Sequence, residues 1–290
     1  MIKISFNGDV REFAAEGKSY IEILSSVDPK LLGSYVAVKD GDAVIDLRDV
    51  PADGACVELV GIESKEALHI LRHTATHIMA EAVKHLFPDA KLTIGPATET
   101  GFFYDFECAP FTKENLEAIE KEMKKIIKSS PRIERQVVTR DEAIAMMKAK
   151  NEPYKLELIE AIPEGERITI YSQDDFADLC MGPHLLNTRL IKGFKLLSTS
   201  TAYWRGDKNN ASLARIYGTA FFTKEDCEAY LAHLEHIKNI DHNKIGREME
   251  LFTTVDVIGQ GLPLLMPKGA KIIQTLQRWI EDLEDNEWGY

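Results

Sequence analysis

The run LHILRHTATHIMAEAVKHLFP (residues 68–88) constrains this chain most, because it reads as one amphipathic helix with two histidines on one face. Apolar residues recur along it at helical spacing, and Pro88 ends it. His73 and His77 lie four residues apart, so their imidazoles project from the same face, one turn apart. An imidazole binds a metal ion or transfers a proton near neutral pH. Alone, the pair is weak evidence for a site, because amphipathic helices often carry histidines at their surface.

A later stretch, DLCMGPH (residues 178–184), offers the complementary groups. It holds the Asp178 carboxylate, the Cys180 thiol and the His184 imidazole, and its Gly-Pro pair favours a rigid loop. HxxxH on a helix and CxxxH on a loop together supply four groups that suit Zn²⁺ in ligand type. The same four groups could serve as polar catalytic residues, and ligand type alone does not decide between the two uses.

Length and composition describe an ordinary globular protein. The 290 residues suffice for two or three domains, and 44% are hydrophobic and 28% charged. No apolar run is long enough to cross a membrane, and the N-terminus lacks the apolar core of a signal peptide. We therefore expect a cytoplasmic protein with no membrane partner. The four cysteines are scattered without a CxxC pair, which argues against a disulfide framework.

The net charge of −12 is not typical of a nucleic-acid-binding protein. Contact with RNA would need a local basic patch, and the stretch KEMKKIIKSSPRIERQ (residues 121–136) is one candidate. Such a charge run is more often the solvated face of a helix.

Residues 1–63 predict a compact unit of order β-β-α-β-β-β. Asn7-Gly8 is a strong hairpin turn, and Ser19 is a plausible N-cap for a helix over residues 19–27. This order in so few residues suggests a β-grasp (ubiquitin-like) fold. No residue in the unit looks catalytic.

Residues 64–222 predict an α+β domain, because helices and strands are interleaved irregularly. It opens with the histidine helix and later contains a helix that Thr112 can cap and another that Pro153 can open. We expect RITIYSQDDFADLC (residues 167–180) to be one strand that runs into the Cys180 loop.

Residues 223–243 predict a connecting helix, and residues 244–290 begin a third unit. That unit ends on a long amphipathic helix which needs a packing partner. We therefore expect the chain to stop inside a larger domain.

The whole chain resembles the N-terminal part of bacterial-type threonyl-tRNA synthetases. The motifs that carry the resemblance, in order, are HTATHIMAEAV, IGP…GFFYDFE, DFADLCMGPHLLNT, AYWRGD, LARIYGTAF, DHNKIGREMELF and GLPLLMPKGA. The resemblance implies a TGS domain (1–63), an editing or threonyl/alanyl second additional domain (64–222), a linker helix (223–243) and the start of a class II catalytic domain (244–290).

The resemblance also implies a function. The family's enzyme joins threonine to tRNA(Thr) with ATP and Mg²⁺, uses a zinc ion whose site lies outside this chain, and is a homodimer. Serine lacks only a methyl group of threonine, and one methyl is worth about 1–3 kcal/mol in a binding pocket. The family therefore hydrolyses mischarged seryl-tRNA(Thr) in the editing domain.

Four residues of this chain match the family's editing positions, and three more match residues near that pocket, where Tyr104 would help to bind the substrate. Cys180 and His77 would shape the pocket wall, and His73 would orient the water or the terminal ribose. His184 and Lys155 would bind the ester and help move protons, and Asp178 would hold the seryl amino group. The full set is His73, His77, Tyr104, Lys155, Asp178, Cys180 and His184.

The resemblance further implies editing without a metal ion, with serine or threonine as the aminoacyl group on tRNA. Three alternatives stay open. Zinc could bind His73, His77, Cys180 and His184. The chain could be a zinc-dependent deacylase of the alanyl type that acts in trans. It could also bind tRNA, or regulate, without turnover.

Overall fold

A computed structural model describes residues 1–6, 8–259 and 261–289 of the chain. It contains helices and several separate sheets, which confirms the α+β class. By their internal contacts the residues form two compact units, Met1–Cys227 and Glu228–Tyr290. Each unit is described by itself.

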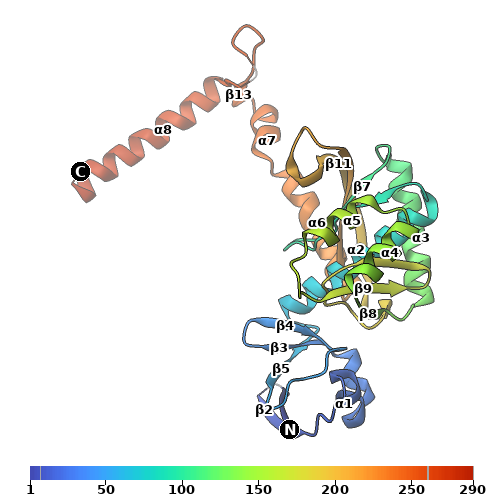
Figure 1. The fold of residues 1–290 in the computed structure, drawn as a ribbon. Helices are drawn as coiled ribbons and strands as arrows, with labels where there is room; N and C mark the ends of the chain where they lie inside the picture. The colour runs from blue at the N-terminus through green and yellow to red at the C-terminus, as the bar shows by residue number, and fades with distance from the viewer. Residues whose placement is uncertain (7, 260, 290) are drawn as a thin grey trace. The chain divides into compact units, whose positions relative to one another are not determined.

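The first unit begins with a five-stranded sheet of order β2-β1-β5-β3-β4 (Figure 1). Strands β1 and β5 run parallel, and the other neighbours are antiparallel. Asn7 of the predicted hairpin lies outside the described residues, whereas Gly8 has a φ of +93°, as such a turn requires. The elements are β1 (Ile2–Phe6), β2 (Asp9–Phe13), α1 (Tyr20–Val27), β3 (Tyr35–Asp40), β4 (Ala43–Asp46) and β5 (Cys56–Gly61).

Helix α1 packs its apolar side on this sheet. Ser19 caps it as predicted, because its hydroxyl accepts from the Glu22 N–H while the Glu22 carboxylate accepts from the Ser19 N–H. Ile4, Leu24 and Val57 are fully buried members of the core between helix and sheet.

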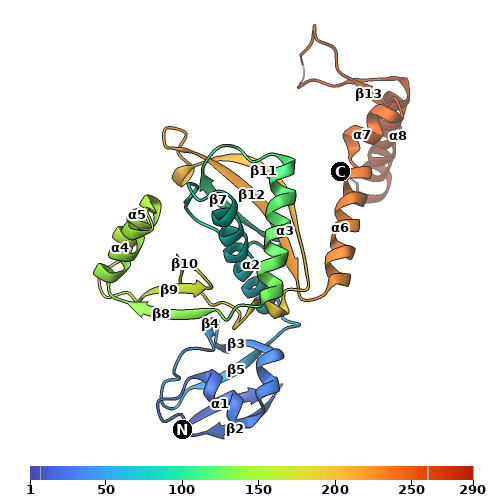
Figure 2. The same ribbon diagram turned by 90° about the vertical axis from the view of Figure 1, so that its right-hand side faces the viewer.

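Helix α2 (Lys65–Leu86) is the central element of the rest of the unit. It lies beside α3 (Lys113–Ser129) and packs against β7 and β12 of a four-stranded sheet of order β11-β12-β7-β6 (Figure 2). Because most of α2 is buried, its polar residues must find partners inside the domain. The strands are β6 (Lys91–Leu92), β7 (Phe102–Glu107), β11 (Gly193–Tyr203) and β12 (Ser212–Phe221).

A three-stranded sheet of order β10-β9-β8 carries the later motif. The expected single strand over residues 167–180 is wrong: β9 (Ile168–Gln173) and β10 (Phe176–Leu179) form an antiparallel hairpin. Asp174 makes the turn with a φ of +45°, a conformation that Asp tolerates better than most residues. β8 (Glu134–Val138), α4 (Arg140–Ala149) and α5 (Pro153–Ala161) complete this part.

The second unit contains most of α6 (Lys224–Asn239) and the elements that follow it. The predicted helix over residues 223–243 is interrupted: α6 ends at Asn239, and Asp241 caps a new helix, α7, by accepting from two backbone N–H groups. The other elements are α7 (His242–Glu248), β13 (Phe252–Thr253), β14 (Leu264–Leu265) and α8 (Pro267–Leu283). None of the helices in the described residues has the length and apolar character needed to cross a bilayer.

Candidate zinc and acyl-transfer site

Helix α2 and the loop after β10 bring four candidate ligands together. The Cys180 Sγ lies 3.2 Å from the Nε2 atoms of both His73 and His184. The His77 ring centroid lies 4.2 Å from that of His184. One donor atom from each of the four residues lies within 4.8 Å of every other. The two motifs, about 100 residues apart in the sequence, thus form one cluster, as their pairing predicted.

The loop depends on Gly182. This residue has a φ of +74°, and a Cβ placed on it would lie 2.1 Å from the Tyr171 hydroxyl. Any other side chain would therefore push the loop off Tyr171 or strain its backbone. Next to it, the Met181 side chain is 86% exposed, whereas Cys180 itself is half-buried.

Thr74 sets the orientation of His184. The Thr74 hydroxyl donates to the Ile70 carbonyl oxygen at 2.9 Å, so it can only accept from the His184 ring nitrogen Nδ1, which lies 3.2 Å away. A proton on Nδ1 leaves the Nε2 lone pair pointing at Cys180, the tautomer that a metal ligand requires. Thr74 was not predicted, although it directly follows His73 in the motif.

Asp178, Lys155 and Tyr104 form a second, adjoining group. The Lys155 Nζ lies 2.6 Å from Asp178 Oδ1, and the Tyr104 hydroxyl donates to Asp178 Oδ2 at 2.7 Å. All three side chains are buried. His77 joins the two groups, because its Nε2 lies 4.0 Å from Asp178 Oδ2. The structure thus brings all seven predicted residues together.

The electrostatics favour neutral imidazoles. Burial lowers the pKa of His73 to about 3 and that of His77 to about 4. Burial also raises the pKa of the Cys180 thiol to about 12. Burial alone would raise the pKa of Asp178, but the Lys155 ammonium and the hydrogen bond from Tyr104 outweigh it and hold that pKa below its ordinary value. Neutral imidazoles are the form that binds a metal.

The expectation that this chain needs no metal of its own is wrong. Adjacent ligands of a tetrahedral zinc with Zn–N and Zn–S bonds of about 2.0–2.3 Å lie about 3.3–3.6 Å apart. The spacing of Cys180, His73 and His184 is close to that, and His77 completes the set. This cluster places a candidate zinc site inside the chain.

The N-terminal sheet supplies the far wall of the site. Asp46, at the end of β4, accepts from the Tyr171 hydroxyl at 3.0 Å and pairs with Arg48 at 2.9 Å. Arg48 in turn donates to the carbonyl oxygens of His184 and Leu185. The sequence predicts no site residue in residues 1–63, and no local pattern marks Asp46 or Arg48.

The candidate basic patch over residues 121–136 is partly neutralised within the chain. Arg135 makes a bidentate ion pair with Asp49, and Lys125 pairs with Glu122. Arg135 is therefore a structural residue rather than a phosphate contact.

Comparison with known proteins shows which class of protein this chain resembles. The sequence model of the threonyl and alanyl tRNA synthetase second additional domain matches residues 168–217, which include Asp178, Cys180 and His184. Over 292 aligned residues the chain is 50% identical to the threonine–tRNA ligase of Clostridium perfringens (strain 13 / Type A), covering all of this chain and 45% of that protein. It is 48% identical over 287 residues to the Listeria monocytogenes threonine–tRNA ligase, covering 98% of this chain and 44% of that protein.

The chain belongs to the threonine–tRNA ligase family and corresponds to the N-terminal portion of its members. It spans a little under half the length of the relatives it matches.

Proposed function

We propose that this chain hydrolyses the ester bond of mischarged seryl-tRNA(Thr). The observation that carries the proposal is the contact between the His73–His77–Cys180–His184 cluster and the buried Lys155–Asp178–Tyr104 group. Ester hydrolysis requires a positioned water, a proton acceptor and a positive group near the carbonyl oxygen. The two groups lie next to each other and supply such chemistry.

Asp178, Lys155 and Tyr104 each have a separate role in the proposed reaction. Asp178 holds the seryl amino group, because a buried carboxylate attracts an ammonium strongly. The Lys155 ammonium, now on Asp178 Oδ1, donates to the ester carbonyl oxygen as negative charge develops there. The Tyr104 hydroxyl fixes the other oxygen of Asp178, so the carboxylate cannot rotate.

His73, His77, Cys180 and His184 are the residues that would hold zinc. When bound, the ion supplies Lewis-acid character and makes a nearby water more acidic. Thr74 keeps His184 in the binding tautomer, and Asp178 lies close enough to orient His77. His73 is half-buried, which leaves it on the open side of the cluster where the tRNA end would enter.

Deacylation of purified aminoacyl-tRNA tests the proposal. Seryl-tRNA(Thr) should be hydrolysed and threonyl-tRNA(Thr) spared. His73→Ala and Asp178→Asn should each slow the reaction by at least about 100-fold, the usual share of a positioned acid–base or electrostatic group. Cys56→Ala, in an exposed position of β5, is the matched control. Hydrolysis by both variants at the parental rate would falsify the assignment.

A second candidate is a zinc-dependent deacylase of the alanyl type that acts in trans. The complete three-histidine, one-cysteine set favours it, and the matched domain model covers both synthetase types. Preference for seryl-tRNA(Ala) over seryl-tRNA(Thr) in the same assay would support it. Binding of tRNA without turnover of either substrate would instead indicate a binding or regulatory fragment.

The domain organisation follows the same proposal. The strand order of residues 1–63 supports a β-grasp TGS domain, and residues 64–222 form the editing domain. Residues 223–243 form the linker, and residues 244–290 begin a class II catalytic domain. The whole protein would be a cytoplasmic homodimer that joins threonine to tRNA(Thr) with ATP.

A further inference from the structure

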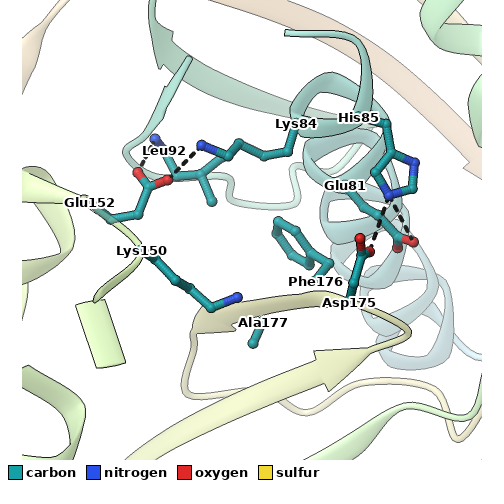
Figure 3. Close-up of a pocket in the computed structure, with 9 residues that line it drawn as sticks. All are labelled: Glu81, Lys84, His85, Leu92, Lys150, Glu152, Asp175, Phe176 and Ala177. Carbon is teal, nitrogen blue, oxygen red and sulfur yellow. Dashed lines mark hydrogen bonds and ion pairs between the residues drawn. The ribbon is translucent and has the colours of Figure 1, made fainter. Parts of the chain in front are cut away.

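A second cluster of metal-binding side chains lies further along α2. Glu81 and His85 continue the four-residue spacing of His73 and His77, and Asp175 reaches them from the β9–β10 turn. Figure 3 shows both carboxylates directed at the His85 ring. His85 Nε2 lies 3.2 Å from Asp175 Oδ1 and 4.0 Å from Glu81 Oε1, and the three donor atoms lie within 4.8 Å of one another.

Glu81 is a buried carboxylate with one oxygen unused. Glu81 is 1% exposed, and its Oε2 accepts a hydrogen bond from the Gln173 side-chain amide at 2.5 Å. Its Oε1 has no hydrogen-bond partner among the described residues. Burial raises the pKa of this carboxyl to about 7. A buried oxygen without a donor is costly, and a cation beside it removes that cost.

His85 is held in the orientation of a metal ligand. Its Nδ1 lies 3.3 Å from Glu122 Oε1 on α3, so a proton on Nδ1 is bound by a carboxylate. The Nε2 atom faces Glu81 and Asp175 and hydrogen-bonds to Asp175 Oδ1, so a metal ion bound there would take the place of the Nε2 proton. Histidine ligands in metal sites commonly have this carboxylate behind the other ring nitrogen.

The opposite wall of the same cavity is already neutralised. The cavity has a volume of about 220 Å³. There, Glu152 accepts from Lys84 at 2.9 Å and from the Leu92 N–H at 2.7 Å (Figure 3). Lys84 therefore neutralises Glu152. The carboxylates of Glu81 and Asp175 lie around His85 instead.

We propose that Glu81, His85 and Asp175 bind a divalent metal ion, with water completing its coordination. Two carboxylate oxygens and one imidazole suit Mn²⁺ or Zn²⁺. The ion links the β9–β10 turn to α2 and has a structural role, whereas the Cys180 cluster takes part in the proposed reaction. Asp178 lies on β10, three residues after Asp175 of the turn, so this site steadies the hairpin that presents Asp178.

Manganese binding to the full chain tests the site. The protein is first given one equivalent of Zn²⁺, which the thiol and imidazoles of the Cys180 cluster prefer, and Mn²⁺ is then titrated and followed by electron paramagnetic resonance. We expect one Mn²⁺ per chain, and an apparent Kd at least tenfold higher in Asp175→Asn and in Glu81→Gln. Asp174→Asn removes a carboxylate from the same turn and should bind as the parent does.

Cys180→Ala, titrated without added Zn²⁺, separates this site from the proposed active site, because it should still bind Mn²⁺ at the parental affinity. Circular dichroism confirms that each variant is folded. Two results would overturn the proposal: the parent binds no Mn²⁺, or Asp175→Asn and Glu81→Gln bind it as tightly as the parent. The cluster would then be a protonated His85 held by three carboxylates.

Discussion

The Asp46 carboxylate accepts a hydrogen bond from the backbone N–H of His184 at 3.3 Å, across 138 residues of sequence. The same carboxylate is buried and paired with Arg48, whose guanidinium also binds the His184 carbonyl oxygen. The N-terminal sheet therefore holds both backbone groups of a candidate zinc ligand. Residues 1–63 carry none of the seven predicted site residues, yet they contribute to the precision of the candidate site.

Replacing Asp46 should damage both stability and activity. In Asp46→Ala the Arg48 guanidinium loses its buried partner, and breaking a buried pair costs about 3–5 kcal/mol. Urea unfolding should show that loss, and seryl-tRNA(Thr) deacylation should fall even where the variant is folded. Asp42→Ala, an exposed position in the same hairpin, should match the parent. An Asp46→Ala protein with parental stability would mean that the Asp46–Arg48 contact contributes nothing.

Removal of Cys180 should abolish stoichiometric zinc. Changes to groups behind metal ligands already weaken binding about 10–100-fold, so loss of a ligand should cost at least as much. Elemental analysis after dialysis against buffered Zn²⁺ should give about one equivalent more for the parent and for Cys56→Ala than for Cys180→Ala. If Cys180→Ala keeps the parental zinc content, the four residues are not the zinc site.

Lys155→Met should leave the Asp178 charge uncompensated. Because both side chains are buried, the free energy of unfolding should drop by about 3–5 kcal/mol, and the pKa of Asp178 should rise. The double variant Lys155→Met/Asp178→Asn removes the stranded charge and should recover part of the loss. Lys150→Met, at an exposed lysine before α5, is the control for a lost surface charge. Equal stability of the single and double variants would show that Lys155 does not neutralise Asp178.

Acid should weaken the contact between the N-terminal sheet and β8. Burial would raise the pKa of Asp49, but Arg135 and Arg167 outweigh it, so this pKa lies below its ordinary value. A depressed carboxyl pKa adds stability above the unfolded value of about 3.9, and that stability is lost as the pH falls through the folded value. The stability difference between the parent and Asp49→Asn should therefore be constant from pH 7 to about 5 and shrink below about pH 4. A difference that does not change with pH would contradict the role given to Asp49.

Local patterns predicted most of the fold, because helices and strands have their own periods and caps. Ser19, Thr112 and Pro153 start helices as expected. Two predicted elements were wrong because an aspartate breaks each of them. Asp174 lies in the turn between β9 and β10, and Asp241 caps the start of α7. Neither position has the glycine or proline that marks most breaks.

The site was predictable to the extent that its residues sit in short motifs. His73 and His77 are paired by spacing, and Asp178, Cys180 and His184 share one short motif, whereas Tyr104 and Lys155 come from the family resemblance. Asp46 and Arg48 act through a contact between distant segments, which no local period encodes. The metal prediction failed because ligand types do not report distances, and the distances favour zinc.

Helix α2 carries His73, His77, Glu81 and His85 at intervals of four residues. Four residues turn an α-helix about 40° past a full turn, so the row winds gradually around the helix. A one-residue insertion between His77 and Glu81 would rotate the later pair by about 100° and shift it by about 1.5 Å along the axis. Such an insertion would take Glu81 and His85 away from Asp175 and Gln173. Insertions and deletions in relatives should therefore avoid this segment and fall in surface loops instead.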